Sequence, residues 1–183
     1  MKFIQVILFV TALSNVTLAQ NPNNVINNVI VNKTSSDTLI IKDSLISTVP
    51  ASNAPVNEMI NYAKRFLGTP YRYSGTTPNG FDCSGFINYV MGNFGFSLPR
   101  SSYGIAELGQ TIKLADVQPG DLLFFKGRNV NSTSVGHVAM VVEVGPNEIR
   151  MIHASTSRGV IIENFKASQY YVPRFLKAKR LNR

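Results

Sequence analysis

Hydrophobic side chains recur at helical spacing in the region that follows residue 55. Over residues 57–67, apolar positions repeat every three or four residues, which predicts a helix that a Gly-Thr-Pro segment ends. A loop rich in Gly and Pro comes next, and a second helix is predicted from Cys83 to Met91. A short third helix is predicted after it, with Ser102 as its N-cap.

The period changes to that of β-strands beyond Lys113. Short apolar or alternating runs are separated by turn signals such as Gly145-Pro146-Asn147, which is typical of strands joined by turns. The predicted strands are residues 122–125, 135–144, 148–154, 159–163 and 174–181. Helices first and strands later predict an α+β domain, in which N-terminal helices pack on an antiparallel β-sheet.

The first nineteen residues have the pattern of a signal peptide. Lys2 gives a positive start, residues 3–13 are mostly apolar, and small residues lead to a cleavage site before Gln20. The apolar run is too short to span a bilayer, which needs about 20 residues. No cysteine follows the cleavage site, so we expect no lipid anchor and no stable membrane anchor. The pattern predicts export to a periplasm, to the cell envelope or into the medium.

Residues 20–54 differ in composition from the rest of the chain. Asn crowds the start of this segment, and Ser and Thr dominate its end, which predicts a flexible linker. Residues 55–183 are long enough to bury one hydrophobic core and are predicted to be the only folded domain.

Composition narrows the class of protein only in part. The chain has 183 residues, of which 44% are hydrophobic and 15% charged, and these values exclude wholesale disorder. The net charge of +8 is compatible with an anionic cell envelope. Nucleic acid is not an expected partner of an exported chain without a recognisable binding module. The oligomeric state is not determined by the sequence, and a monomer is the default expectation.

The single cysteine excludes an intramolecular disulfide and any zinc site with two or more thiolates. Cys83 lies where the Gly-rich loop gives way to the second helix, between Asp82 and Ser84. Unpaired N–H groups at a helix N-terminus favour a thiolate, so we expect a lowered thiol pKa. The same groups can stabilise an oxyanion. A buried structural cysteine is the alternative interpretation.

The only two histidines fall in neighbouring predicted strands. The midpoint between His137 and His153 is residue 145, which lies in the turn signal between the strands. In an antiparallel hairpin centred there, the two imidazoles would lie directly opposite each other, with Cβ atoms about 5 Å apart. A thiol, an imidazole and a third polar group that orients it form the usual layout of a cysteine nucleophile.

Two other interpretations of these residues stay open. Cys83, His137 and His153 could bind one zinc ion, although no carboxylate nearby is an obvious general base. The two histidines could also be unrelated core residues. Tyr71, in the loop before the cysteine, could donate a hydrogen bond to an oxyanion or to a bound carbonyl group.

The ordered motifs of this region resemble those of the NlpC/P60 family of cell-wall cysteine peptidases. The motifs are Leu67-Gly68-Thr69-Pro70-Tyr71-Arg72-Tyr73, Gly80-Phe81-Asp82-Cys83-Ser84-Gly85-Phe86, Leu98-Pro99-Arg100-Ser101-Ser102, Gln118-Pro119-Gly120-Asp121-Leu122, Gly136-His137-Val138 and Ile152-His153-Ala154-Ser155. They cover nearly all of residues 55–183. The sequence departs from the family pattern at Ser74, which replaces the first of two usual glycines, and in a longer hairpin between the histidines.

The resemblance implies a papain-like α+β fold with the cysteine at a helix N-terminus. It implies that Cys83 is the nucleophile, His137 its base and His153 the orienting residue. Tyr71 would help hold substrate and oxyanion, and Asp82 and Ser84 would line the substrate site.

The activity that the resemblance implies is hydrolysis of peptidoglycan stem peptides through an acyl-enzyme. The cleaved amide would join γ-D-glutamate to a diamino acid, with no metal and no organic cofactor. Two alternatives remain: an amidase of the N-acetylmuramoyl-L-alanine type, and a non-catalytic peptidoglycan-binding module. The presence of Cys83, His137 and His153 together argues against the second alternative.

Overall fold

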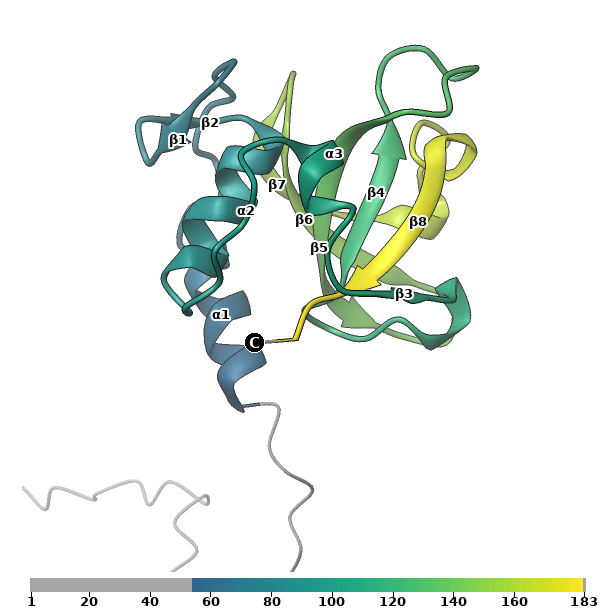
Figure 1. The fold of residues 1–183 in the computed structure, drawn as a ribbon, viewed down its shortest axis with the longest axis horizontal. Coiled ribbons are helices and arrows are strands. Elements are labelled where there is room, and N and C mark those ends of the chain that lie inside the picture. Colours follow the sequence, from purple (N-terminus) through teal and green to yellow (C-terminus); the bar gives the residue numbers. More distant parts are fainter. Residues whose placement is uncertain (1–53, 183) are drawn as a thin grey trace, which may run out of the picture. The chain divides into compact units, whose positions relative to one another are not determined.

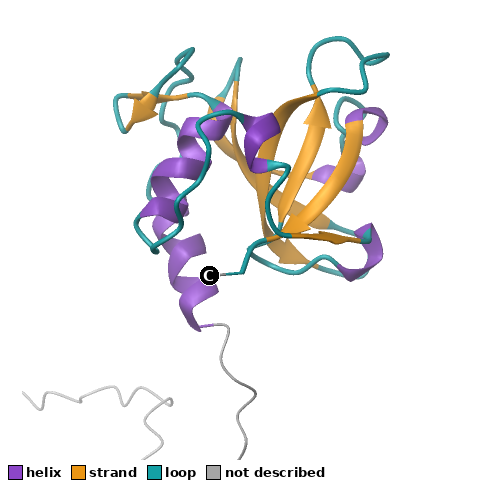
Figure 2. Ribbon diagram, viewed as in Figure 1, coloured by secondary structure: helices purple, strands orange, loops and turns teal. Residues whose placement is uncertain are grey.

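The computed structural model describes residues 54–182, in which helices pack beside an antiparallel sheet. The helices are α1 (Ala54–Lys64), α2 (Cys83–Gly92) and α3 (Ser102–Ile105). The main sheet is built from β3 (Gln110–Ile112), β4 (Leu122–Lys126), β5 (Val135–Val144), β6 (Ile149–Ser155), β7 (Gly159–Asn164) and β8 (Phe175–Arg180). Figures 1 and 2 show the three helices gathered on one side of this sheet.

The six strands follow the order β3-β8-β4-β5-β6-β7, and every neighbouring pair is antiparallel. Strands β4 to β7 are neighbours in sequence and in the sheet, whereas β8 returns to pair with β4. A separate hairpin, β1 (Thr76–Thr77) with β2 (Gly80–Phe81), lies in the loop before α2. The predicted class, helices packed on an antiparallel sheet, is confirmed.

Several element boundaries differ from the prediction. Helix α1 starts three residues early and stops at Lys64, and backbone bonds such as Arg65 N to Tyr62 O (3.1 Å) continue the chain as turns. The cap of α3 is Ser101, whose hydroxyl accepts from Gly104 N at 3.2 Å, and not Ser102. Strand β3 was not predicted, because three mostly exposed residues carry no apolar alternation.

Two predictions about the N-terminal part lie outside the described residues. The signal peptide at residues 1–19 falls there entirely. The linker at residues 20–54 does so too, except that Ala54 is the first residue of α1. In the part of the chain that the structure describes, no helix has the length and apolar character needed to cross a membrane.

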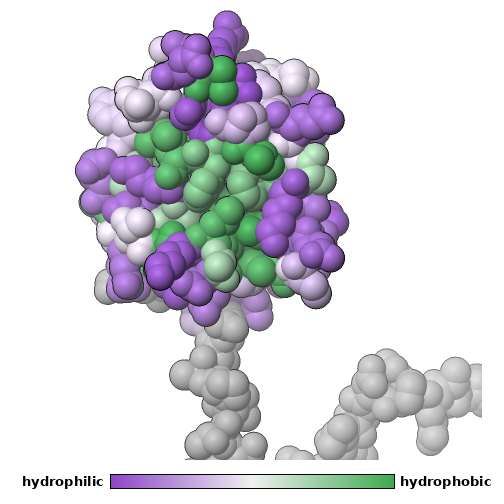
Figure 3. All heavy atoms as spheres, turned by 90° about the vertical axis from the view of Figure 1, so that its right-hand side faces the viewer, coloured by the Kyte–Doolittle hydropathy of each residue, from purple (hydrophilic) through white to green (hydrophobic). Residues whose placement is uncertain are grey.

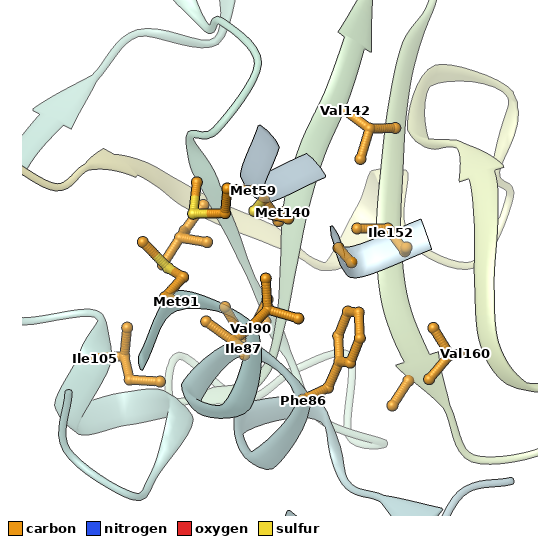
Figure 4. Packing of buried hydrophobic residues seen from close by; sticks show 14 of the residues in the cluster. Met59, Phe86, Ile87, Val90, Met91, Ile105, Met140, Val142, Ile152 and Val160 are labelled. Atoms are coloured by element: carbon orange, nitrogen blue, oxygen red, sulfur yellow. The ribbon is translucent and has the colours of Figure 1, made fainter. Parts of the chain in front are cut away.

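One hydrophobic core joins the helices to the sheet and fixes the position of α2. Phe86, Ile87 and Val90 of α2 point toward Met140 of β5 and Ile152 of β6 (Figure 4), and all five are fully buried. Burying such a side chain contributes about 1.5–3 kcal/mol. The packing therefore holds the N-terminus of α2, which carries Cys83, against the middle of the sheet.

A second core covers the opposite face of the sheet. Alternate residues of the strands, such as Phe125 and Met151, pack there beneath Phe165 and Tyr171. These two come from the segment that holds the 3₁₀ helices η2 (Phe165–Ala167) and η3 (Val172–Arg174). Figure 3 shows apolar side chains in the middle of the face that lies on the right of Figure 1, with polar side chains around them.

Candidate active site

Cys83 is the first residue of α2, and Asp82 caps this helix. Asp82 has extended backbone angles, and its Oδ1 accepts from the backbone N–H of Gly85 at 2.6 Å. Gly85 is required by packing, since a Cβ atom there would lie 2.0 Å from the carbonyl oxygen of Gly75. The preceding loop therefore lies directly against the start of the helix.

Ser74, in that loop, is the position where the sequence departs from the family's glycine pattern. Its φ angle of 58° is in the left-handed region, where a residue with a side chain is disfavoured. The loop thus keeps a conformation that glycine adopts at low cost, with Ser in its place.

The sulfur of Cys83 is half-buried and lies near backbone N–H groups that affect its pKa. Burial and, next, the charge of Asp82 raise the pKa of the thiol, whereas N–H groups of Val138, Ser84 and Cys83 itself act in the opposite direction. The expected lowering of the thiol pKa is therefore wrong for the free protein, because desolvation of the thiolate outweighs the helix N-terminus. The contact with Val138 brings the sulfur to β5, next to His137.

Arg100 ties the predicted substrate-lining residues together. Its Nη1 donates to Asp82 Oδ1 at 3.0 Å and to Ser84 Oγ at 2.9 Å, and its Nη2 donates to Asp82 Oδ2. Ser84 Oγ also donates to Asp82 Oδ1 at 3.3 Å. The three side chains form one network on the loop side of Cys83.

The two histidines lie on the same face of the sheet but not directly opposite each other. The register pairs Met140 with Ile152 and shifts at a bulge between Val141 and Glu143. Extending this register places residue 139, and not His137, opposite His153. The prediction of directly opposite imidazoles is wrong, because the turn is centred later than residue 145. An even offset keeps both rings on one face, as diagonal neighbours.

The histidine rings are nevertheless in hydrogen-bonding contact. Nε2 of His137 lies 3.0 Å from Nδ1 of His153, with the rings perpendicular. His153 is fully buried, and its Nε2 lies 2.6 Å from Oε1 of Glu163 on β7. Arg158 Nη2 in turn donates to both carboxylate oxygens of Glu163 at 3.1 Å.

This series of contacts determines where the protons lie. The hydrogen bond with His153, and then Arg158, hold the pKa of Glu163 below its ordinary value, so Glu163 is an ionised acceptor at neutral pH. Nε2 of His153 therefore carries a hydrogen, and in the neutral form of His153 its Nδ1 accepts from His137 Nε2–H. The remaining nitrogen of His137, Nδ1, is then free of its proton and can act as a base.

Burial, and then the charge of His153, hold the pKa of His137 well below its ordinary value. His137 is consequently neutral at pH 7. Among the described residues, no hydrogen bond joins the His137 ring to the Cys83 sulfur, so the free protein holds a neutral thiol beside a neutral imidazole.

Two tyrosines lie near the polar residues of the site, Tyr171 beside the histidines and Tyr71 near Cys83 and Asp82. The ring of Tyr171 stacks on His137, with centroids 5.4 Å apart, and its hydroxyl lies 3.5 Å from Nδ1 of His153. Burial, and then the charge of Glu163, raise the pKa of Tyr171. Burial, and then the charges of Cys83 and Asp82, raise the pKa of Tyr71. Both phenols stay protonated and can donate hydrogen bonds.

The structure thus forms two groups from the predicted residues. Cys83, Asp82 and Ser84 lie together at the start of α2, and Tyr71 lies close enough for the charge of Cys83 to affect its pKa. His137 and His153 form the second group on β5 and β6. Within residues 54–182, no set of three or more His, Cys, Asp or Glu side chains has an arrangement suited to a metal ion.

Glu163, Arg158 and Tyr171 were not predicted from the sequence to belong to the site. Glu163 reaches His153 only because β7 pairs with β6, with Met151 opposite Glu163. The signal available in the sequence was Glu163 itself, a charged residue in a predicted strand that was expected to lie next to the strand of His153. Arg100 was part of a quoted motif, but no role was assigned to it.

The model of the NlpC/P60 family matches residues 68–180, more than half of the chain. Over 124 residues the chain is 38% identical to the "Gamma-DL-glutamyl hydrolase" of Bacillus subtilis (strain 168), covering 67% of this chain and 29% of that protein. Over 115 residues it is 38% identical to the "Probable endopeptidase NlpC" of Escherichia coli (strain K12), covering 62% and 70%. The chain therefore spans less than a third of the first relative.

A solved structure has the same fold. The crystal structure of the NlpC/p60 domain of the peptidoglycan hydrolase SagA superposes with a TM-score of 0.55 at 28% identity. The match covers 71% of this chain and 99% of that domain. The described part of the chain thus corresponds to a whole domain of this type.

Proposed function

The chain belongs to the NlpC/P60 family, and on this premise we propose that it is a cysteine endopeptidase that hydrolyses peptidoglycan stem peptides. The bond we assign is the amide between γ-D-glutamate and the following diamino acid. The observation that carries the proposal is the hydrogen-bonded series Glu163–His153–His137. His137 is followed by Val138, whose backbone N–H lies near the Cys83 sulfur.

In the first step, Nδ1 of His137 takes the proton of Cys83 as the sulfur attacks the substrate carbonyl carbon. The new imidazolium donates its Nε2–H to His153, and the charge of Glu163 stabilises it through His153. The raised thiol pKa and the lowered imidazole pKa mean that proton transfer accompanies the attack. Catalytic hydrogen bonds are often long in free enzymes and shorten when substrate binds.

The tetrahedral intermediate places a negative charge on the former carbonyl oxygen. Backbone N–H groups at the start of α2 and the phenol of Tyr71 are the donors that support its stabilisation. The C–N bond then breaks, and His137 gives its proton to the departing amine. A thioester on Cys83 remains, and a water that His137 deprotonates hydrolyses it to release the acid.

We assign the binding of the acyl part of the substrate to the Asp82–Ser84–Arg100 network. This network lies beside Cys83 and carries both a cation and a carboxylate. Names of relatives support the choice of bond and substrate, since one refers to γ-DL-glutamyl hydrolysis and another to peptidoglycan.

The proposal extends to the parts of the chain outside the described residues. Residues 1–19 would direct export and be removed, residues 20–54 would serve as a linker, and residues 55–183 would be the catalytic domain. The composition of these segments supports the assignment. Sequencing the N-terminus of protein recovered from outside the cytoplasm tests it: a start at Gln20 is expected, and a start at Met1 would contradict export by cleavage.

Digestion of purified peptidoglycan, with mass analysis of the soluble fragments, tests the activity. We expect new free amino groups on the diamino acid with the wild type and none with Cys83→Ala. Intact stem peptides released from the sugar would indicate the amidase instead. An absence of any new fragment would indicate a binding module, and stoichiometric zinc in the purified protein would contradict the mechanism.

A further inference from the structure

Tyr171 covers the face of the sheet that carries the two histidines. In β5, His137 alternates with Ala139, a member of the second core. In β6, His153 alternates in the same way with Met151. Tyr171 belongs to the same core, is 7% exposed, and comes from the segment between β7 and β8. Both imidazoles therefore lie on the side of the sheet where Tyr171 packs.

The aromatic ring of Tyr171 lies with its face against the ring of His137. The two centroids are 5.4 Å apart and the ring planes differ by 28°, which is an offset stack. Phe125 and Tyr170 each meet the Tyr171 ring edge to face, with centroids 5.0 Å away. Aromatic packing thus fixes the orientation of Tyr171 toward His137.

The positive charge that forms on His137 in the proposed reaction has no carboxylate directly beside it. Within residues 54–182, no carboxylate pairs with the His137 ring, and Glu163 contacts His153 on the nitrogen that does not face His137. The other titratable groups around His137 are Cys83 on α2, His153 on β6 and, in the lining of the adjoining cavity, Tyr71, Tyr73, Lys126, Arg128, Arg158 and Tyr170. Three of these are cations, which oppose a further positive charge. Stabilisation of the imidazolium therefore depends on contacts other than an ion pair.

We propose that the ring face of Tyr171 stabilises the imidazolium of His137, and so lowers the barrier to proton transfer from Cys83. A cation within about 6 Å of the centroid of an aromatic ring is attracted by the negative charge of the ring face. The neutral imidazole lacks this attraction, so the contact strengthens as the charge develops. Such a contact raises kcat rather than tightening substrate binding. Tyr171 is then a positioning residue that acts through His137, and the inference rests on the proposed function.

The hydroxyl group of Tyr171 has a smaller part in this arrangement than the ring. It lies 3.5 Å from Nδ1 of His153, whose single lone pair already accepts from His137 at 3.0 Å. Burial raises the pKa of Tyr171, so the phenol is protonated at neutral pH and brings no negative charge to the histidines. The ring and the hydroxyl can therefore be separated by substitution.

Kinetics with the free-acid tripeptide L-Ala-γ-D-Glu-diaminopimelate test the inference. In Tyr171→Leu, which removes the ring, we expect kcat to fall about three- to five-fold with KM little changed. The acid limb of the kcat/KM profile should move to lower pH, because protonated His137 is less stable without the ring. Tyr171→Phe, which keeps the ring, should retain most of kcat and the wild-type limb. A limb that stays in place or moves to higher pH in Tyr171→Leu would overturn the inference.

Phe165→Leu is the matched control for the loss of a ring from the second core. Phe165 packs against Phe125 and Phe175, and within residues 54–182 its ring contacts neither histidine. The substitution should lower the Tm and leave the acid limb in place. A shift of the limb as large as that in Tyr171→Leu would mean that general packing, and not the stacked ring, affects His137.

Fluorinated rings separate the charge of the ring face from its shape. Phenylalanine with one, two or three ring fluorines is incorporated in place of Tyr171, because fluorine withdraws electrons from the ring face with little change in size. We expect kcat to fall stepwise with each added fluorine, to a total of about three- to five-fold. Circular dichroism verifies that each variant is folded. A kcat that is independent of fluorination would overturn the inference and leave the proposed function intact, whereas no cleavage by the wild type would overturn both.

Discussion

At the scale of single residues, the protonation states of Cys83 and His137 are the feature with most consequence. The pKa of the thiol is raised and that of the imidazole is lowered, so both groups are neutral at pH 7. Many cysteine nucleophiles are instead thiolates held by a cation. In the proposed mechanism, the network around His153 prepares His137 as a base, and the thiolate forms only during attack.

Alkylation of Cys83 by iodoacetamide in the free protein tests this state. Since only the thiolate reacts, we expect the rate to be low at pH 6–7 and to rise through and above the ordinary thiol pKa of about 8.5. Cys83 is the only cysteine, so loss of free thiol reports it directly. Fast alkylation that is constant from pH 5 to 8 would show a preformed thiolate–imidazolium pair, contrary to this account.

Glu163 is predicted to act through His153 as a positioning residue. In Glu163→Gln, the amide oxygen can still accept from His153 Nε2–H, but the negative charge is lost. We expect kcat to fall about ten-fold, from a loss of about 1.4 kcal/mol, with KM little changed. Removing the charge also disfavours protonated His137, so the acid limb of the kcat profile should move to lower pH.

The matched control is Arg158→Gln, which weakens the hold on Glu163 without touching either histidine. Its effect on kcat should be smaller than that of Glu163→Gln. If Glu163→Gln changes only thermal stability and leaves the pH profile in place, the role of Glu163 is structural and the positioning role is refuted.

At the scale of elements, the start of α2 depends on its close contact with the preceding loop. A Cβ atom at Gly85 would lie 2.0 Å from the Gly75 carbonyl oxygen, whereas one at Gly92, at the end of the same helix, would meet nothing within 4 Å. The two glycines therefore respond oppositely to the same substitution.

Denaturant unfolding of Gly85→Ala and Gly92→Ala measures this difference. We expect Gly85→Ala to lower the free energy of unfolding by about 1–3 kcal/mol, because backbone must move to accommodate the methyl group. Gly92→Ala should raise it, by up to about 1 kcal/mol, through helix propensity. Equal effects of the two substitutions would show that α2 does not lie against the loop as described.

Elements with a long apolar run were predictable from the sequence. The strand predicted at 135–144 has the bounds of β5, because its apolar residues pack on both faces of the sheet. Strand β3 and the hairpin of β1 and β2 are too short to show a period. The register of the β5–β6 hairpin could not be predicted either. The bulge at residues 141–143 depends on how β5 packs rather than on its pattern of apolar and polar residues.

At the scale of the whole molecule, the sequence predicted the fold class, and the motifs predicted the family. The resemblance singled out Cys83, His137 and His153 in sequence order, but it could not give the contacts that set their protons. Those contacts come from Glu163 and Arg158, which the pairing of β7 with β6 brings to His153. The roles of the catalytic residues remain predictions.

The low pKa of His137 also predicts how stability depends on pH. Below the ordinary histidine pKa of about 6.5, the unfolded chain binds a proton at His137 that the folded chain does not yet bind. Stability should therefore fall as pH decreases from 7 to 5. The lowered pKa of Glu163 adds a further loss as pH falls through the ordinary carboxyl range.

Thermal unfolding at several pH values measures this dependence. Between pH 7 and 5, we expect the Tm of the wild type to fall more than that of His137→Gln, which cannot bind the proton. A parallel decrease in both proteins would mean that His137 is not held neutral by the fold.

Intact-protein mass spectrometry of a quenched reaction can detect the proposed acyl-enzyme on Cys83. The purified protein is mixed with the free-acid tripeptide L-Ala-γ-D-Glu-diaminopimelate and stopped in acid within a turnover. We expect a fraction of the protein to be heavier by the L-Ala-γ-D-Glu acyl group, attached at Cys83 and absent from Cys83→Ala. Turnover of the tripeptide without any adduct on Cys83 would contradict the proposed mechanism. Turnover that is retained in Cys83→Ala would contradict it as well.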